Sequence, residues 1–237
     1  MLLLGAALLS LRHVLKRRPR HAVLESMHNY GIRSLGIITV VAVFTGMILA
    51  LNTGIALRDF GQEVNVGTAV MVSMLREMGP FMTGLILAAC VGSAMAAQLG
   101  TMVVSEEVAA LEVMSIDPVR YLVLPKLASM AIMTPLLTFY SCMMGVVGGG
   151  IVARFLLDVR WDRYIDNAMW FAEAKDLYVG LLKAFIFSII ITIVACHAGF
   201  SASEGAVGVG KATRSAVIVS FLLILFAGLL ITGLFYY

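Results

Sequence analysis

The sequence predicts an all-α membrane protein with five transmembrane helices. Of its 237 residues, 61% are hydrophobic and only 13% are charged, whereas soluble domains carry about 25% charged residues. A helix needs roughly 20 apolar residues to cross a bilayer, and transmembrane β-strands instead alternate over about 10 residues. The apolar runs are continuous and long enough for helices, and together they predict one domain over residues 1–237. They are Ser34–Leu57, Val64–Val104, Leu127–Ala153, Leu177–Ser203 and Ser215–Tyr237.

Residues 1–33 form a basic segment before this five-span bundle of residues 34–237. The apolar run Leu2–Leu9 is too short to cross a bilayer, and it precedes the basic residues, which is the reverse of the order in a signal peptide. A basic amphipathic helix in the membrane interface fits this pattern, and a frayed basic tail is the alternative. Because cytoplasmic segments are rich in Lys and Arg, we expect the N-terminus inside and the C-terminus outside. Residues 105–126 and 199–214 would then lie inside, with residues 58–65 and 154–176 outside.

The second apolar run carries two charges in its middle, Arg76 and Glu77. An ionised residue at the centre of a lipid-facing helix costs about 2.5–3.5 kcal/mol or more, so both side chains must face protein, water or lipid headgroups. Gly79-Pro80 follows and predicts a kinked or broken helix. Lys183, in the fourth run, is the expected partner of Glu77. These charges form either a structural ion pair or a contact with a lipid phosphate or a moving gate.

The segment Ser105–Pro125 is polar and lies between the second and third spans. Its acids, Glu106, Glu107, Glu112 and Asp117, cannot lie in a bilayer core. We therefore expect this segment at the cytoplasmic membrane surface, where a soluble partner can reach it.

Local patterns in this segment predict two helix starts. Ser105 is a suitable N-cap, with acids in the first turn where they suit the helix dipole. Val108, Leu111 and Met114 recur at i, i+3 and i+6, which predicts a narrow apolar stripe. Asp117-Pro118 predicts a second N-cap with proline at the first helical position. The result is a short amphipathic helix followed by a re-entry helix, and an ordinary surface loop is the alternative.

Motifs for catalysis are missing from the sequence. It contains no Gly-x-x-x-x-Gly-Lys-Ser/Thr phosphate loop, and Gly205–Gly210 does not have that spacing. The four histidines are scattered, and no nucleophile–base set is present. Cys90, Cys142 and Cys196 fall in predicted spans, where we expect them to be small buried hydrophobes. We expect no enzyme activity, no metal, no cofactor of its own and no nucleic-acid partner.

Several motifs occur together in one order and spacing. They are Arg76-Glu77-Met78-Gly79-Pro80, Gly92-Ser93-Ala94, Leu99-Gly100-Thr101-Met102, Glu106–Met114 with Asp117-Pro118, and Ser203–Val217. With these motifs, the chain resembles the permease family typified by MlaE over roughly residues 28–237. Proteins of that family are the membrane subunits of ABC transporters that work with MCE-domain proteins.

The resemblance implies a homodimeric permease in a bacterial inner membrane, moving phospholipid to or from an MCE-domain protein on the outer side. ATP and Mg²⁺ would be bound by a separate cytoplasmic ATPase, which docks on the helix between spans 2 and 3. The implied ATPase-coupling residues are Glu106, Glu107, Val108, Leu111, Glu112, Met114, Asp117 and Pro118. The residues implied to line a lipid cavity at the dimer interface are Ile48, Leu51, Asn52, Ile55, Leu75, Met78 and Met82.

Three positions depart from the family pattern. Cys90 replaces the usual Arg, Gln98 the usual acid, and Gly228 the usual Asp. We hypothesise that these positions form one charge network in relatives, which was lost as a unit here.

Two other function classes remain open. A stand-alone secondary transporter or channel would need a midplane site and usually an internal repeat, and the sequence shows no repeat. A membrane scaffold without transport activity is the other class. Co-purification with an ATPase separates both from the ABC transporter.

Overall fold

The computed structural model describes residues 19–170 and 172–237, so the expected interfacial helix lies partly outside the described residues. Every regular element in this part of the chain is helical. Five helical runs in it are long and apolar enough to cross a membrane, which confirms the predicted fold class. Each run begins before the predicted apolar stretch, because the residues that precede the stretch continue the helix, and the fourth run ends at Phe200, before the predicted Ser203. The runs are Val23–Arg58, Glu63–Val104, Val119–Leu156, Ala174–Phe200 and Gly205–Tyr236.

The chain forms two compact units, each assembled from three separate stretches of sequence. Of the described residues, unit 1 comprises residues 19–34, Gly84–Thr134 and Phe185–Ala227. Unit 2 comprises Leu35–Thr83, Gly228–Tyr237 and the described residues of Pro135–Ala184. Four helices contribute residues to both units: α5 (Gly79–Leu87), α8 (Leu124–Leu156), α10 (Ala174–Phe200) and α11 (Gly205–Tyr236).

Unit 2 also contains α3 (Leu35–Arg58), η3 (Glu63–Asn65), α4 (Val66–Ser73), the π-helical turn η4 (Met74–Met78), the start of α5 (Gly79–Leu87) and α9 (Trp161–Trp170). Its helices pack closely because glycines face each other. A Cβ on Gly46 of α3 would collide with the carbonyl of Gly145 on α8, and one on Gly148 would collide with the backbone of Val43. Glycine therefore lets two backbones meet at these positions.

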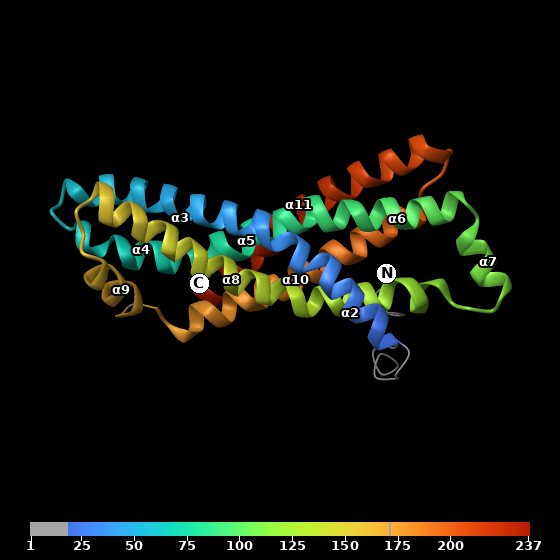
Figure 1. The fold of residues 1–237 in the computed structure, drawn as a ribbon, viewed down its shortest axis with the longest axis horizontal. Helices are drawn as coiled ribbons and strands as arrows, with labels where there is room; N and C mark the ends of the chain where they lie inside the picture. The colour runs from blue at the N-terminus through green and yellow to red at the C-terminus, as the bar shows by residue number, and fades with distance from the viewer. Residues whose placement is uncertain (1–18, 171) are drawn as a thin grey trace. The chain divides into compact units, whose positions relative to one another are not determined.

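Helix α9 lies within the stretch that the sequence analysis assigned to an outside loop. It packs against α4 (Figure 1), and its buried face includes Tyr164 and Ala168. The hydroxyl of Tyr164 donates a hydrogen bond to the carbonyl of Val146 at 3.0 Å. Burial raises the pKa of Tyr164, because a phenolate loses its hydration in an apolar core.

Unit 1 contains α2 (Pro19–Tyr30), η2 (Ile32–Ser34), η5 (Ala88–Gly92), α6 (Ser93–Val104), α7 (Glu107–Val113) and the π-helical turn η6 (Val119–Val123). Leu99, Val123 and Cys196 form part of its core. The expected inside loop at residues 199–214 is shorter than predicted, because α11 already begins at Gly205. Lys211 therefore projects from a helix, not from a loop.

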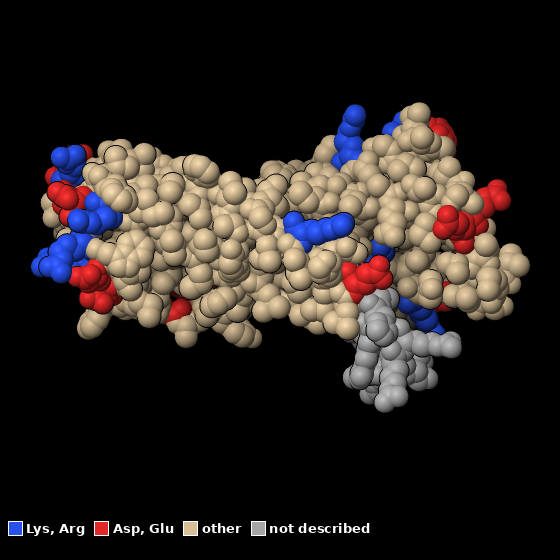
Figure 2. Space-filling view, viewed as in Figure 1, with Lys and Arg blue, Asp and Glu red and all other residues tan. Residues whose placement is uncertain are grey.

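Charged side chains are unevenly spread over the surface. Figure 2 shows them gathered over the α3–α4 turn and the start of α9 in unit 2, and over α7 in unit 1. In unit 2, α3 carries no charged residue before Arg58, as expected for a helix that spans a membrane. Cys142 and Cys196 are buried as predicted, but Cys90 is exposed, so the prediction was wrong for that residue.

Candidate functional site

The two charges of the second span lie on a π-helical turn in unit 2, where they meet partners from α10 and α11. Lys183 of α10 donates to the carboxylate Oε1 of Glu77 at 2.6 Å. This confirms the expected pairing. The hydroxyl of Thr232 on α11 accepts from Lys183 at 2.7 Å and donates to the same Glu77 oxygen at 2.6 Å. Three helices are thus joined through one ion pair.

The backbone of the π-helical turn explains a further hydrogen bond of Lys183. In an α-helix the N–H of residue 80 would bond to the carbonyl of Arg76, but Pro80 has no N–H. Lys183 donates to that carbonyl instead, at 2.8 Å. The N–H of Gly79 reaches back to the carbonyl of Met74 and closes the wider turn. The expected break at Gly79-Pro80 is therefore a π-helical turn within a continuous helical run.

Arg76 has a separate partner, Asp176, which the sequence analysis placed in an outside loop. The Arg76 Nε donates to Asp176 Oδ1 at 2.7 Å, and the hydroxyl of Tyr236 donates to the same oxygen at 2.7 Å. The guanidinium also lies over the Tyr236 ring, 4.6 Å from its centroid. Asp176 is fully buried, and its Oδ2 has no hydrogen-bond partner among the described residues. One feature of the sequence could have indicated this partner: Asp176 is seven residues from Lys183, which puts the two side chains on one face of α10.

The polar segment of unit 1 forms α7, a short helix with a left-handed residue on each side. Glu106 has φ 62° before it, and Ser115 has φ 60° after it. The N–H of Ser115 bonds to the carbonyl of Glu112, and that of Ile116 to Leu111, both at 2.9 Å, which is a Schellman ending. These turns fix the direction in which α7 leaves α6 and enters η6 (Figure 1).

The start of α7 differs from the prediction. Ser105 ends α6, and its hydroxyl lies 3.0 Å from Glu107 Oε1 instead of capping the backbone. Glu106, in the left-handed conformation, occupies the N-cap position without a side-chain cap. The expected cap of Ser105 was therefore wrong. The second predicted start is confirmed, since Asp117 Oδ1 accepts from the N–H of Val119 at 2.9 Å, with Pro118 between them.

The exposed apolar surface of α7 also differs from the expected stripe. Val108 and Leu111 are only half exposed, whereas Met114 is 67% exposed and Val113, which the pattern did not include, is 87% exposed. Glu107, Glu112 and Glu106 are exposed too. The outward surface is thus an apolar pair at the end of the helix, flanked by acids.

Comparison with known proteins assigns the family. The family model described as Permease MlaE matches residues 23–234. The chain belongs to the MlaE permease family. It is 39% identical over 206 residues to a probable ABC transporter permease protein of Rickettsia conorii, a match that covers 87% of this chain and 80% of that protein. It is 30% identical over 220 residues to the intermembrane phospholipid transport system permease protein MlaE of Haemophilus influenzae, covering 90% and 82%. It is 28% identical over 213 residues to the chloroplastic protein TRIGALACTOSYLDIACYLGLYCEROL 1 of Arabidopsis thaliana, covering 90% of this chain and 61% of that protein.

The residues that the MlaE resemblance assigned to a lipid cavity fall in two environments in unit 2. Ile48, Leu51, Asn52 and Ile55 lie on the exposed face of α3, opposite a buried face of small residues. Leu75 is buried in the core of the unit, with 5% of its surface exposed. The remaining two, Met78 and Met82, are half-buried. Their role in a cavity remains a prediction.

The hypothesis of one charge network at the positions that depart from the MlaE pattern stays a prediction. Cys90 and Gln98 lie eight residues apart on one helical run. Gln98 accepts a hydrogen bond from Lys126. Gly228, in unit 2, contributes only its carbonyl, which lies 2.9 Å from the Thr232 hydroxyl.

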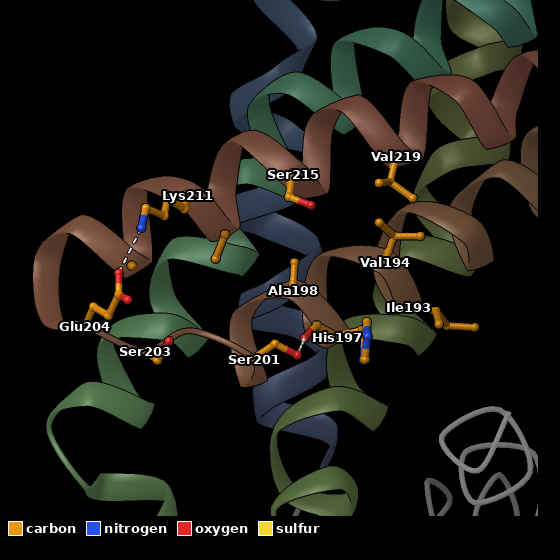
Figure 3. A pocket seen from close by; sticks show the side chains of 12 residues that line it. Ile193, Val194, His197, Ala198, Ser201, Ser203, Glu204, Lys211, Ser215 and Val219 are labelled. Carbon is orange, nitrogen blue, oxygen red and sulfur yellow. Dashed lines mark hydrogen bonds and ion pairs between the residues drawn. The ribbon is translucent and has the colours of Figure 1, made fainter.

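Unit 1 also contains a cleft that the sequence analysis missed. Its volume is about 570 Å³, and it lies between the end of α10 and the start of α11. Figure 3 shows Ile193, Val194 and Val219 at one end and the ion pair of Lys211 with Glu204, 2.8 Å apart, at the other. The cleft is therefore apolar at one end and polar at the other. It contains none of the residues that the sequence predicted for a site.

Proposed function

We propose that this chain is the permease subunit of an ATP-driven lipid transporter and that α7 is the surface on which its ATPase docks. Membership of the MlaE permease family supports the lipid substrate, as does the likeness to a permease named for intermembrane phospholipid transport. The sequence has no phosphate loop of its own, so the energy of ATP would come from a separate chain.

The observation that carries the docking proposal is the exposed end of α7. Val113 and Met114 project from a helix that two left-handed residues hold in place. In water, such apolar side chains favour burial against a partner. The acids around them favour a partner groove with Lys or Arg at its rim. ATP and Mg²⁺ would be bound by that partner.

Orientation and assembly form the rest of the proposal. The chain would lie in a bacterial inner membrane with its N-terminus and α7 in the cytoplasm. In support, α7 and the α10–α11 turn belong to unit 1, whereas the α3–α4 turn, α9 and the C-terminus belong to unit 2. Two copies would pair so that the exposed face of α3 lines a lipid cavity, which opens toward an MCE-domain protein.

Co-purification with the ATPase tests this function. Val113→Asp places a charge at the centre of the proposed contact without touching the core, and Glu112→Lys reverses one acid. We expect each to reduce ATPase recovery at least tenfold in a pull-down from detergent-solubilised membranes. Phe60→Asp is the matched control, because Phe60 is 79% exposed on the α3–α4 turn of unit 2.

Two results would contradict the proposal. One is unchanged ATPase recovery with both α7 variants. The other is lipid movement between vesicles and an acceptor protein at the full rate without any ATPase, which would favour a stand-alone transporter. A chain that neither recovers an ATPase nor moves lipid would be a scaffold.

A further inference from the structure

Lys126, in the first turn of α8, is a buried cation in unit 1. Only 7% of its surface is exposed. Its Nζ donates to the side-chain oxygen of Gln98 at 2.6 Å and to the hydroxyl of Tyr30 at 2.9 Å. It also lies 5.6 Å from the centroid of the Tyr30 ring. Both hydrogen-bond partners are neutral, so neither compensates the charge, and an ammonium has a third N–H to donate.

No carboxylate of the described residues forms an ion pair with Lys126. The undescribed residues, 1–18 and 171, contain no Asp or Glu, so their side chains cannot supply one. A buried charge without a partner is strongly unfavourable, and Lys126 is therefore suited to an anion from outside the chain.

Lys126 lines a pocket of about 770 Å³. This volume is within the usual range for small-molecule sites. Arg120 is a second cation at the pocket, and its Nε lies 3.4 Å from Asp117 Oδ2. Glu25 is the acid in the lining, and it is exposed and forms no ion pair with Lys126. The apolar residues Leu122 and Pro125 form part of the wall, and neutral hydrogen-bonding groups form the rest: Ser26, Asn29, Tyr30, Gln98 and Tyr121.

We propose that this pocket binds a phosphate group, with Lys126 as its buried counter-ion and Arg120 as a second cation. Several donors that converge on one cavity, two of them charged, match a tetrahedral oxyanion better than a neutral ligand. The phosphate belongs either to a lipid headgroup or to a free phosphate. The proposal stands independently of the transport function, because it rests on the charge balance of one pocket.

The direct test is binding to the full-length protein in an uncharged detergent. One arm measures phosphatidylglycerol, with phosphatidylcholine for comparison, by native mass spectrometry. The other measures inorganic phosphate by equilibrium dialysis. Binding in the first arm alone identifies a lipid headgroup, and binding in the second identifies a free phosphate. Absence of binding in both arms overturns the proposal.

Two variants locate the site. Gln98→Glu keeps the shape of the side chain but places a carboxylate where Lys126 already donates, so it should compete with the external anion. Lys126→Gln removes the cation. We expect at least tenfold weaker binding in each, with Gln98→Glu fully folded. Lys211→Gln is the control: Lys211 is 70% exposed in the same unit and already paired with Glu204, so its loss should change binding less than twofold. Wild-type binding by both site variants would also overturn the proposal.

Discussion

Two buried lysines, Lys183 in unit 2 and Lys126 in unit 1, have similar hydrogen-bond partners but differ in the net charge of their sites. They are 1% and 7% exposed. Each donates to a hydroxyl group, and each donates at 2.6 Å to a side-chain oxygen. That oxygen belongs to a carboxylate, Glu77, in unit 2 and to an amide, Gln98, in unit 1.

This difference between an acid and an amide separates two uses of a buried cation. The pair of Lys183 with Glu77 is neutral as a whole, so it can hold η4, α10 and α11 together without a ligand. The Lys126 site joins α2, α6 and α8 in the same way but keeps a positive charge. The first arrangement is complete within the chain, and the second is suited to an anion from outside.

The largest expected effect comes from making the first site resemble the second. Glu77→Gln leaves the buried Lys183 without its counter-ion. Because the Glu77 side chain is itself 41% exposed, we expect a loss of about 2–3 kcal/mol, below the range of about 3–5 kcal/mol for a fully buried pair. Equilibrium unfolding in detergent micelles measures this loss. The double variant Glu77→Gln with Lys183→Met should recover most of it, because it removes the stranded charge.

The control for this prediction is Asp59→Asn, which neutralises an exposed acid in the α3–α4 turn of the same unit. We expect it to change the free energy of unfolding by less than about 0.5 kcal/mol. A loss for Glu77→Gln no larger than this control would contradict the view that charge balance holds the three helices together.

Residue patterns predicted one of the two ion pairs that the η4 turn of unit 2 makes. Lys183 was the lysine within a predicted span, so its pairing with Glu77 followed from the high cost of leaving either charge in lipid. Asp176 was missed because the apolar run defined the start of the span, and the carboxylate lies just before it. The helix continues past the run, and this places Asp176 within reach of Arg76.

The segment around α7 shows a different limit. Its helical nature and its second cap at Asp117 were evident from the sequence, but its first residue and its exposed face were not. Glu106 and Ser115, on the two sides of α7, adopt left-handed backbone conformations that glycine favours. Because neither position is a glycine, the residue pattern does not indicate these turns.

A smaller effect is expected when the cation of the second site is removed. Lys126→Met removes the hydrogen bonds to Gln98 and Tyr30, but it also removes a buried charge that has no counter-ion, and this offsets part of the loss. We therefore expect a net loss below about 2 kcal/mol in phosphate-free buffer. The matched variant Lys183→Met leaves the Glu77 carboxylate behind and should lose more in the same unfolding experiment. If Lys126→Met lost more unfolding free energy than Lys183→Met, this would contradict the view that Glu77 neutralises Lys183 whereas Gln98 leaves Lys126 charged.

The smallest expected effect is the loss of one neutral hydrogen bond, which serves as a reference for the losses at the two lysine sites. Tyr164→Phe removes the bond from the Tyr164 hydroxyl to the carbonyl of Val146 and should cost about 1 kcal/mol.

Because burial raises the pKa of Tyr164 in the folded state, the unfolded chain loses this proton first. The contribution of the neutral hydroxyl is therefore fully present below a pH of about 10, the pKa of an unfolded tyrosine, and declines above it. Unfolding of wild type and variant at neutral pH and at alkaline pH measures this, and the difference between them should shrink as the pH rises. A constant difference would mean that the Tyr164 environment does not favour the neutral form.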